Sequence, residues 1–187
     1  MTIKNFNKNK AENEKQTFLK VYDNCVDNIY RFVYFKIGNK EEAEDLTSAV
    51  FLKGWNYLQE NKIINFKALK SLFYKIARHL IIDYYRKTNL RNNLSLTEAE
   101  KLGGFDEKQD LAKQAEITSD LVVIESKLPE LKDEYREVII LRFVNELSIK
   151  EIAEILEKPK GTVRVLIYRA INALKDLIKK DNIESVE

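Results

Sequence analysis

The chain has 187 residues, of which 44% are hydrophobic and 33% charged, and its formal net charge is +2. This composition excludes a disordered or collagen-like chain and favours one or two small globular domains. The single Cys25 excludes an internal disulfide framework and a cysteine-rich metal site. The sequence has no apolar run near the roughly 20 residues of a membrane span, and its polar start does not resemble a signal peptide. We therefore expect a cytoplasmic protein without membrane insertion, metal or cofactor.

Long stretches with a 3.6-residue hydrophobic period, five Gly and two Pro predict an all-α fold. Residues 1–15 are predicted to form a disordered N-terminal tail. A helix follows and ends at Gly38. Cys25 is interpreted as a packed thiol, because no catalytic partner is evident near it. The apolar face of this helix is predicted to consist of Phe18, Tyr22, Cys25, Ile29, Phe32 and Phe35.

The next predicted helix begins after Asn39 and runs to about Leu58, with Ala43, Leu46, Val50 and Tyr57 facing inward. Its opposite side presents Asp45, Ser48, Leu52 and Asn56, with Trp55 at the edge. A large apolar residue in the middle of an outward face indicates a protein-binding surface. The alternative is that a further helix of the same domain covers this face.

Gln59–Lys67 is predicted as a polar loop, followed by a helix over about Ala68–Lys87 that buries Leu69, Phe73, Ile76, Leu80 and Tyr84. Residues 61–87 contain seven basic residues and one acidic residue. Cations alternating with aromatic rings suit a phosphate backbone and unstacked bases, although a solvated face with two partly buried tyrosines is an open alternative. The residues outside the apolar stripe are Tyr74, Lys75, Arg78, His79, Tyr85, Arg86 and Lys87.

Residues 88–119 are predicted to form a flexible acidic linker, with Gly103 and Gly104 near its middle. Residues 88–121 contain four basic and seven acidic residues. A second domain is expected from residue 120. Its first helix is predicted to reach Leu128, and another helix to extend from Pro129 to Phe143.

Residues 147–175 have the pattern of a helix-turn-helix. A first helix over Ile149–Leu156 is predicted to have Ser148 as N-cap and Glu151 as the partner in a capping box. Glu157–Gly161 breaks this helix, and Thr162 is expected to cap the second one. An apolar stripe of Val163, Ile167, Ala170 and Leu174 then directs Arg164, Val165, Tyr168 and Asn172 outward, as in a DNA recognition helix. An ordinary helical hairpin with a basic face is the alternative.

Three segments resemble bacterial sigma factors of the sigma-70 class, in particular the compact extracytoplasmic-function (ECF) group. AEDLTSAVFLKGW (residues 43–55) resembles the region 2 segment that binds the RNA polymerase clamp. LFYKIARHLIIDYYRK (72–87) resembles the helix that engages the −10 element. LPELKDEYREVIILRFVNELSIKEIAEILEKPKGTVRVLIYRAINALK (128–175) resembles region 4, which engages the −35 element and the polymerase flap. The resemblance implies region 2 over residues 16–87 and region 4 over residues 120–180.

The resemblance implies a sigma factor without catalytic activity, which binds core RNA polymerase, directs it to promoters and promotes DNA opening. An anti-sigma factor is an expected further partner. Clamp binding is expected from Asp45, Ser48, Leu52 and Trp55. Binding of the −10 element is expected from the basic helix, with Asn65 and Phe66 holding a flipped base. Binding of the −35 element is expected from Lys160, Thr162, Arg164, Val165, Tyr168 and Arg169.

The chain departs from the family pattern at several of these positions. Ser48 replaces a usual Gln, and Leu72 and His79 replace a usual Trp and Asn. Val165 and Leu166 stand where Ser-Arg is common, and Ile171 replaces a common Arg. We expect the changes at Val165, Leu166 and Ile171 to remove hydrogen-bonding and phosphate-binding groups, so that isolated region 4 binds DNA more weakly and with less salt dependence than in a typical relative. Val165 could instead contact a thymine methyl.

Two other functions fit parts of the pattern. A stand-alone helix-turn-helix regulator with an N-terminal helical interaction domain would bind operators without polymerase, whereas a sigma factor of this type binds duplex promoters poorly alone. A gel shift with and without core polymerase distinguishes the two. A purely protein-binding helical scaffold agrees less well with the aromatic and basic helix and with the Gly161-Thr162 turn.

Overall fold

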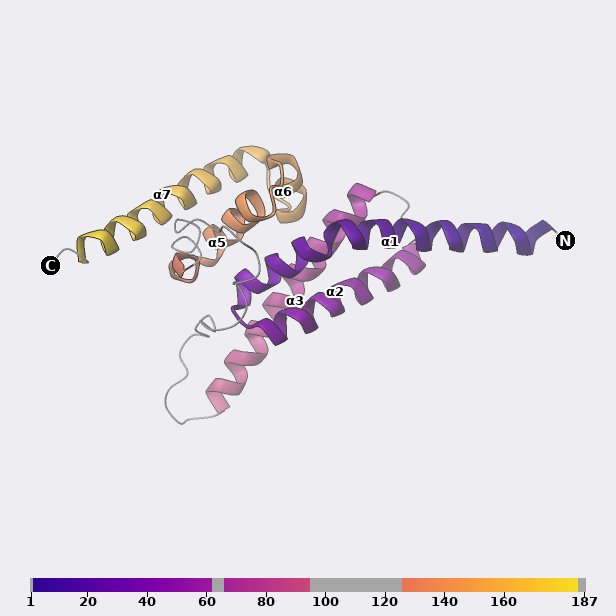
Figure 1. Cartoon of the computed structure of the whole chain (residues 1–187), viewed down its shortest axis with the longest axis horizontal. Coiled ribbons are helices and arrows are strands. Elements are labelled where there is room, and N and C mark those ends of the chain that lie inside the picture. Colours follow the sequence, from indigo (N-terminus) through magenta and orange to yellow (C-terminus); the bar gives the residue numbers. More distant parts are fainter. Residues whose placement is uncertain (1, 62–65, 95–125, 185–187) are drawn as a thin grey trace, which may run out of the picture. The chain divides into compact units, whose positions relative to one another are not determined.

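In the computed structural model, residues 2–61, 66–94 and 126–184 are described, and every element within them is helical, as the all-α prediction requires (Figure 1). The chain divides into two compact units. The first comprises Met1–Val33 and Glu41–Thr97, and the second comprises Tyr34–Lys40 and Glu98–Glu187.

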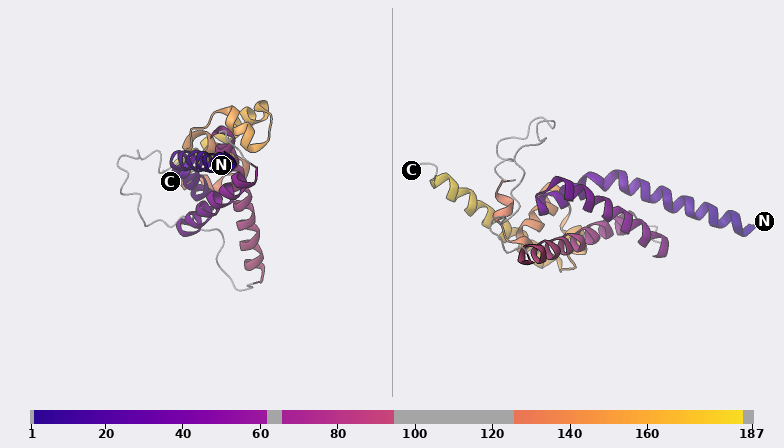
Figure 2. Two further views of the ribbon diagram at one scale, coloured as in Figure 1. Left: turned by 90° about the vertical axis from the view of Figure 1, so that its right-hand side faces the viewer. Right: turned by 90° about the horizontal axis from the view of Figure 1, so that it is seen from below.

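The first long helix, α1, extends over Thr2–Ile37. The prediction of a disordered tail over residues 1–15 is therefore wrong, and the first turns of α1 extend beyond α2 and α3 (Figure 2). The physical reason is composition, because this segment is rich in Lys and Glu, which favour helices, and contains no Gly or Pro to interrupt one. The helix ends as predicted at Gly38, which has a φ of 73°. The Gly38 N–H donates a hydrogen bond of 2.8 Å to the Tyr34 carbonyl.

Two further helices complete the first unit: α2 over Lys40–Asn61 and α3 over Phe66–Leu94. Helix α3 therefore continues through Thr88–Leu94, where the start of the linker was predicted. Residues 88–94 contain no Gly or Pro, so no strong helix breaker interrupts α3 before Leu94. The remainder of the predicted linker, residues 95–119, lies outside the described residues.

The three helices of the first unit pack around an aromatic cluster. The ring of Phe73 on α3 lies 4.7 Å from Phe51 of α2 and 5.9 Å from Phe18 of α1, measured between ring centroids. Gly54 allows α2 to approach α3 closely, because a Cβ added to it would lie 2.2 Å from the Phe73 Cε1 atom. The crossing of α2 and α3 thus depends on a glycine inside a helix.

The buried faces of α2 and α3 differ in part from the predicted ones. On α2, Ala43 and Val50 are buried as expected, but Leu46 is only half-buried and Tyr57 is 42% exposed. Thr47, Gly54 and Leu58 take their places in the interior. On α3, Leu69 and Phe73 are buried as expected. The predicted Ile76, Leu80 and Tyr84 are half-buried, and the core contains Tyr74, Ala77 and Ile81 in their place.

Most of the predicted apolar face of α1 is confirmed. Cys25, Ile29 and Phe32 are buried, whereas Tyr22 is 37% exposed. Burial raises the pKa of the Cys25 thiol above its ordinary value. A buried, protonated thiol packs as a small apolar group, in agreement with the prediction.

After residue 127 the second unit contains a short 3₁₀ helix, η2 (Leu128–Glu130), followed by α5 (Asp133–Ile139) and a π-helical turn, η3 (Ile140–Val144). A single helix over Pro129–Phe143 is therefore the wrong prediction. The backbone is extended at Leu131 (ψ 149°), so the two helices cannot be continuous. The Arg136 Nη2 atom donates a 2.7 Å hydrogen bond to the Pro129 carbonyl and holds the turn against α5. Most of the helix predicted to end at Leu128 lies outside the described residues.

The unit is completed by α6 (Ile149–Leu156) and α7 (Lys160–Glu184). Helix α7 packs against both α5 and α6. Each helix directs side chains at helical spacing into one shared interior, and these side chains are aliphatic. These side chains include Val138, Leu141, Ile152, Ile155, Val163, Ala170 and Leu174.

Candidate nucleic-acid and protein-binding surfaces

The capping box predicted at the start of α6 is present. The Glu151 N–H donates a 3.3 Å hydrogen bond to Ser148 Oγ, and the Ser148 N–H donates one of 2.9 Å to the Glu151 carboxylate. The helix ends at Glu157, which has a φ of 54° in the left-handed region. These local interactions define the turn that leads into α7.

Helix α7 begins at Lys160, two residues before the predicted cap. Thr162 therefore lies in the first turn rather than at the N-cap, and the Val163 N–H donates a 3.1 Å hydrogen bond to the Pro159 carbonyl. Gly161 is also part of the helix, and a Cβ added to it would meet nothing within 4 Å. The left-handed backbone conformation in this turn occurs at Glu157 and not at Gly161.

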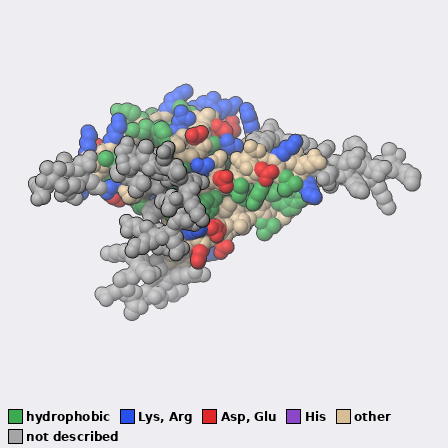
Figure 3. Space-filling view, viewed as in Figure 1, with side chains coloured by type: hydrophobic (Ala, Val, Ile, Leu, Met, Phe, Trp, Pro, Cys, Tyr) green, Lys and Arg blue, Asp and Glu red, His purple; other side chains and the backbone are tan. Residues whose placement is uncertain are grey.

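The outward face of α7 contains every residue predicted for it except Asn172, which is half-buried. Val165 is 47% exposed and Tyr168 is 68% exposed. Leu166 stands where a polar residue is common in the family, but it is buried in the core, so the outward face loses no group through this change. Leu166 occupies the interior position that was predicted for Ile167, and Ile167 is half-buried. The exposed members of the predicted set are Lys160, Thr162, Arg164, Val165, Tyr168 and Arg169. In the space-filling view, Lys and Arg side chains gather over this part of the second unit (Figure 3).

On α3 the structure corrects one predicted site residue. Tyr74 is completely buried, with its ring 5.5 Å from that of Phe32, so it cannot contact a nucleic acid. The reason is that α3 is packed by both α1 and α2, which widens its buried arc. Lys75, Arg78 and Tyr85 are half-buried, and His79, Arg86 and Lys87 are exposed.

The same face contains an apolar residue that the sequence analysis missed. Ile82 is 59% exposed and lies between His79 and Arg86 at a spacing of three and four residues. The spacing of Ile82 from these two residues was the signal in the sequence that it lies on their face of the helix. The Arg86 guanidinium pairs with Asp83 at 3.0 Å, in agreement with a structural role for this aspartate. Asn65 lies outside the described residues, and Phe66 begins α3 but its side chain is not described.

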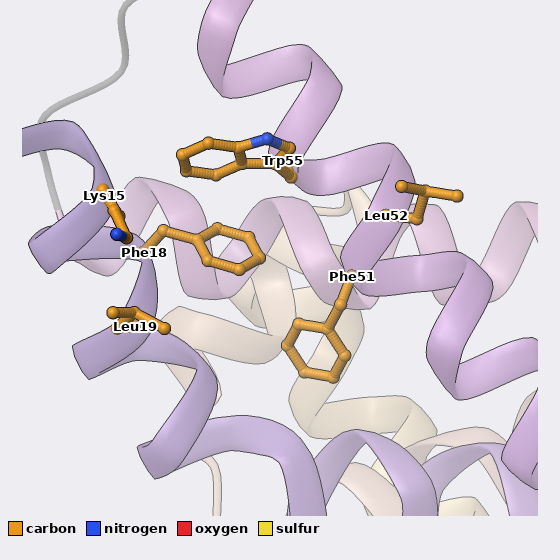
Figure 4. Close-up of a pocket in the computed structure, with 6 residues that line it drawn as sticks. All are labelled: Lys15, Phe18, Leu19, Phe51, Leu52 and Trp55. Carbon is orange, nitrogen blue, oxygen red and sulfur yellow. The ribbon is translucent and has the colours of Figure 1, made fainter. Parts of the chain in front are cut away.

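On α2, Asp45, Ser48 and Leu52 are exposed and Trp55 is half-buried, as predicted. Leu52 is 63% exposed, so within the described residues no further helix covers it. Beside it lies an open apolar groove of about 440 Å³ between α1 and α2 (Figure 4). The Trp55 and Phe18 rings meet edge to face at 4.9 Å in this groove. Its lining consists of Lys15, Phe18, Leu19, Phe51, Leu52 and Trp55.

The α1 side of this groove was not predicted. Hydrophobic spacing predicts Phe18 on the interior face, and residues up to Lys15 were expected to form a tail. Leu19 is 46% exposed and adds a further apolar side chain to the rim. The absence of Gly and Pro before residue 16 was the available signal that the helix begins earlier. None of the helices that the structure describes combines the length and apolar character needed to cross a bilayer.

Comparisons with known proteins agree with the geometry of both units. Residues 21–91 match the family model for sigma-70 region 2, and residues 121–174 match the model for sigma-70 region 4. The chain is 31% identical over 188 residues to the ECF RNA polymerase sigma factor SigW of Bacillus subtilis, covering 96% of this chain and 98% of that protein. It is 28% identical over 170 residues to SigX of the same organism, covering 86% and 83%.

Among solved structures, the sigma factor RpoE of Bartonella quintana, in complex with the anti-sigma factor NepR, has a similar fold. The TM-score is 0.63 at 23% sequence identity, covering 88% of this chain and 96% of that one. One assignment therefore agrees with the two helical units, with the helix-turn-helix and with the relatives that match along nearly their whole length. The chain belongs to the sigma-70 family and is an ECF RNA polymerase sigma factor.

Proposed function

We propose that this chain binds core RNA polymerase, directs it to promoters through the −10 and −35 elements, and promotes DNA opening. The observation that carries the proposal is the exposed apolar groove beside Leu52, in a chain whose other unit contains a helix-turn-helix. A protein that acts on polymerase requires a protein-binding face, and the exposed groove supplies one in the unit without the helix-turn-helix. A regulator that forms dimers would also need such a face, and the gel shift described below separates the two functions.

The face of α2 is proposed to bind the polymerase clamp. An exposed leucine beside a half-buried tryptophan provides the type of apolar anchor that dominates binding energy at protein interfaces. Ser48 and Asp45 supply polar groups about one and two turns before Leu52 on the same helix. The groove adds Phe18 and Leu19 of α1 to this surface.

The basic face of α3 is proposed to bind the −10 element and the separated strand. Extruding a base from the duplex requires a few kcal/mol, so stacking and phosphate contacts must offset this unfavourable free energy. Cations on one helix face can hold the backbone while the preceding loop receives the base. The proposed set, from which Tyr74 is now removed, is Asn65, Phe66, Lys75, Arg78, His79, Tyr85, Arg86 and Lys87.

The helix-turn-helix is proposed to bind the −35 element, with α7 in the major groove. Arg164, Arg169 and Lys160 supply phosphate contacts, and Val165 and Tyr168 face the bases. The second unit is also proposed to bind the polymerase flap, as region 4, and the first to act as region 2. The acidic segment after α3 is proposed as the linker between them.

An anti-sigma factor is a further proposed partner, since the similar RpoE structure was solved with one bound. The proposed function requires no catalysis by this chain and implies action in the cytoplasm, where bacterial polymerase and DNA are found.

The test is transcription in vitro with purified core polymerase on a promoter library. We expect the full chain to produce transcripts from a defined subset of promoters that core enzyme alone does not transcribe. A gel shift on one selected promoter, with and without core, separates this function from that of a stand-alone regulator. Tight, specific binding of the free chain as a dimer would contradict the proposal.

A further inference from the structure

The centre of the outward face of α7 is nearly free of charged side chains. With 3.6 residues per turn, Gly161, Val165 and Tyr168 follow one line along the helix, which continues to the half-buried Asn172. This line lies opposite the buried Val163, Leu166, Ala170 and Leu174. Val165 and Tyr168 occupy the middle of this line and are 47% and 68% exposed. An aliphatic side chain and an aromatic ring thus form the most outward part of the first turns.

The charged residues flank this line. Arg164 precedes Val165 and Arg169 follows Tyr168, and neighbours in an α-helix are separated by about 100° around the axis. The two exposed arginines consequently lie on opposite sides of the apolar pair. A helix in the major groove with this arrangement has its guanidinium groups toward the phosphates of the two walls and its apolar residues toward the base edges.

The chemistry of the groove then limits what can be recognised. The thymine methyl is the apolar group that base pairs present at the major-groove floor. Gly161 lies at the start of the apolar line without a Cβ, in open space, so the backbone can approach the bases there. We propose, on the basis of the proposed function, that Val165 and Tyr168 read thymine methyl groups and that discrimination at the −35 element depends on these methyls.

The experiment uses holoenzyme assembled from the full chain and core polymerase, on a promoter selected by transcription. Each thymine of its −35 element is replaced by deoxyuridine, which removes the methyl and keeps the O4 acceptor. Burial of one methyl contributes about 0.8 kcal/mol, so we expect binding to weaken about fourfold for each contacted methyl. The same replacement between the −35 and −10 elements is the control and should leave binding unchanged.

Two variants separate base reading from general affinity. Val165→Ala should reduce the preference for thymine over deoxyuridine. Arg169→Ala should weaken binding to both DNAs equally and leave that preference unchanged. Equal binding of thymine and deoxyuridine DNA, an unchanged preference in Val165→Ala, or a −35 element without A·T pairs would overturn the inference. Absence of transcription from every promoter would instead contradict the proposed function itself.

Discussion

The two helices with DNA-binding character, α3 and α7, differ in how wide an arc of each helix is buried. Helix α3 contacts α1 through Tyr74 and both α1 and α2 through Phe73, so two adjacent positions of the helix are fully buried. Helix α7 buries Val163, Leu166, Ala170 and Leu174, which form one narrow stripe. A helix with a wider buried arc retains a smaller free face, and hydrophobic spacing alone locates that face less accurately.

The difference explains the unequal success of the site predictions. On α7 the predicted DNA-binding residues are exposed, whereas on α3 an aromatic residue assigned to DNA lies in the core and the exposed Ile82 was missed. Hydrophobic periodicity describes a helix with one narrow buried stripe well. Where the buried arc is wide, a tyrosine can be completely buried if its hydroxyl finds a hydrogen-bond partner.

The largest expected effect is on the stability of the first unit. Tyr74→Ala removes a fully buried ring and should lower the free energy of unfolding by about 3–5 kcal/mol. The matched change on the other helix, Tyr168→Ala, removes an exposed ring and should alter stability by less than about 0.5 kcal/mol. Chemical denaturation of the full chain followed by circular dichroism measures both. A Tyr74→Ala protein as stable as the parent would refute the assignment of Tyr74 to the core.

The next effect concerns the protein-binding face. Leu52→Glu places a charge on an exposed apolar anchor and should weaken binding to core polymerase by about 2 kcal/mol or more, without unfolding the domain. Co-purification with core enzyme measures it. Lys53→Glu, an added acidic residue at the neighbouring exposed position, is the matched control and should bind nearly normally. Normal co-purification of Leu52→Glu would show that polymerase binds elsewhere.

The two helical glycines provide a third contrast. Gly54→Ala would force a Cβ against the Phe73 ring and should destabilise the first unit by about 1–3 kcal/mol. Gly161→Ala meets nothing and should stabilise α7 by about 0.5–1 kcal/mol, because alanine loses less backbone entropy. Thermal denaturation of the two variants compares them directly. Equal effects would show that the α2–α3 crossing tolerates a side chain.

A smaller effect is expected from the cations of α3. Arg78→Ala combined with Arg86→Ala should reduce the slope of promoter binding against salt concentration by about one for each phosphate that is no longer bound. Promoter opening, followed by permanganate reactivity of unpaired thymines, should be impaired while binding to core polymerase is retained. Loss of core binding in this double variant would contradict the separation of the two faces in the first unit.

The smallest effect tests where α6 and α7 begin. Ser148→Ala removes the N-cap of α6 and should lower stability by about 1 kcal/mol. Thr162→Ala should have almost no effect, since Thr162 lies inside α7 rather than at its cap. If Thr162→Ala proved the more damaging of the two in a denaturation curve, the observed start of α7 would be incorrect.

Interactions between residues close in the chain could be predicted from the sequence. The Ser148–Glu151 capping box, the end of α1 at Gly38 and the alternation of buried and exposed residues on α7 depend on spacings of a few residues. The resemblance of three separate segments to one family added the proposed functions of the faces. Each of these signals is present in a short stretch of sequence, because the physical interaction that it reports is itself local.

Contacts between distant segments had to come from the folded structure. That Tyr74 is buried and Ile82 exposed follows from the positions of α1 and α2 around α3, which no periodicity within α3 contains. The requirement for glycine at Gly54 depends on a ring 19 positions later in the chain. The apolar groove likewise joins Leu19 of α1 to Leu52 of α2. Packing joins residues that the chain separates, and the resulting surfaces exist only after the helices have met.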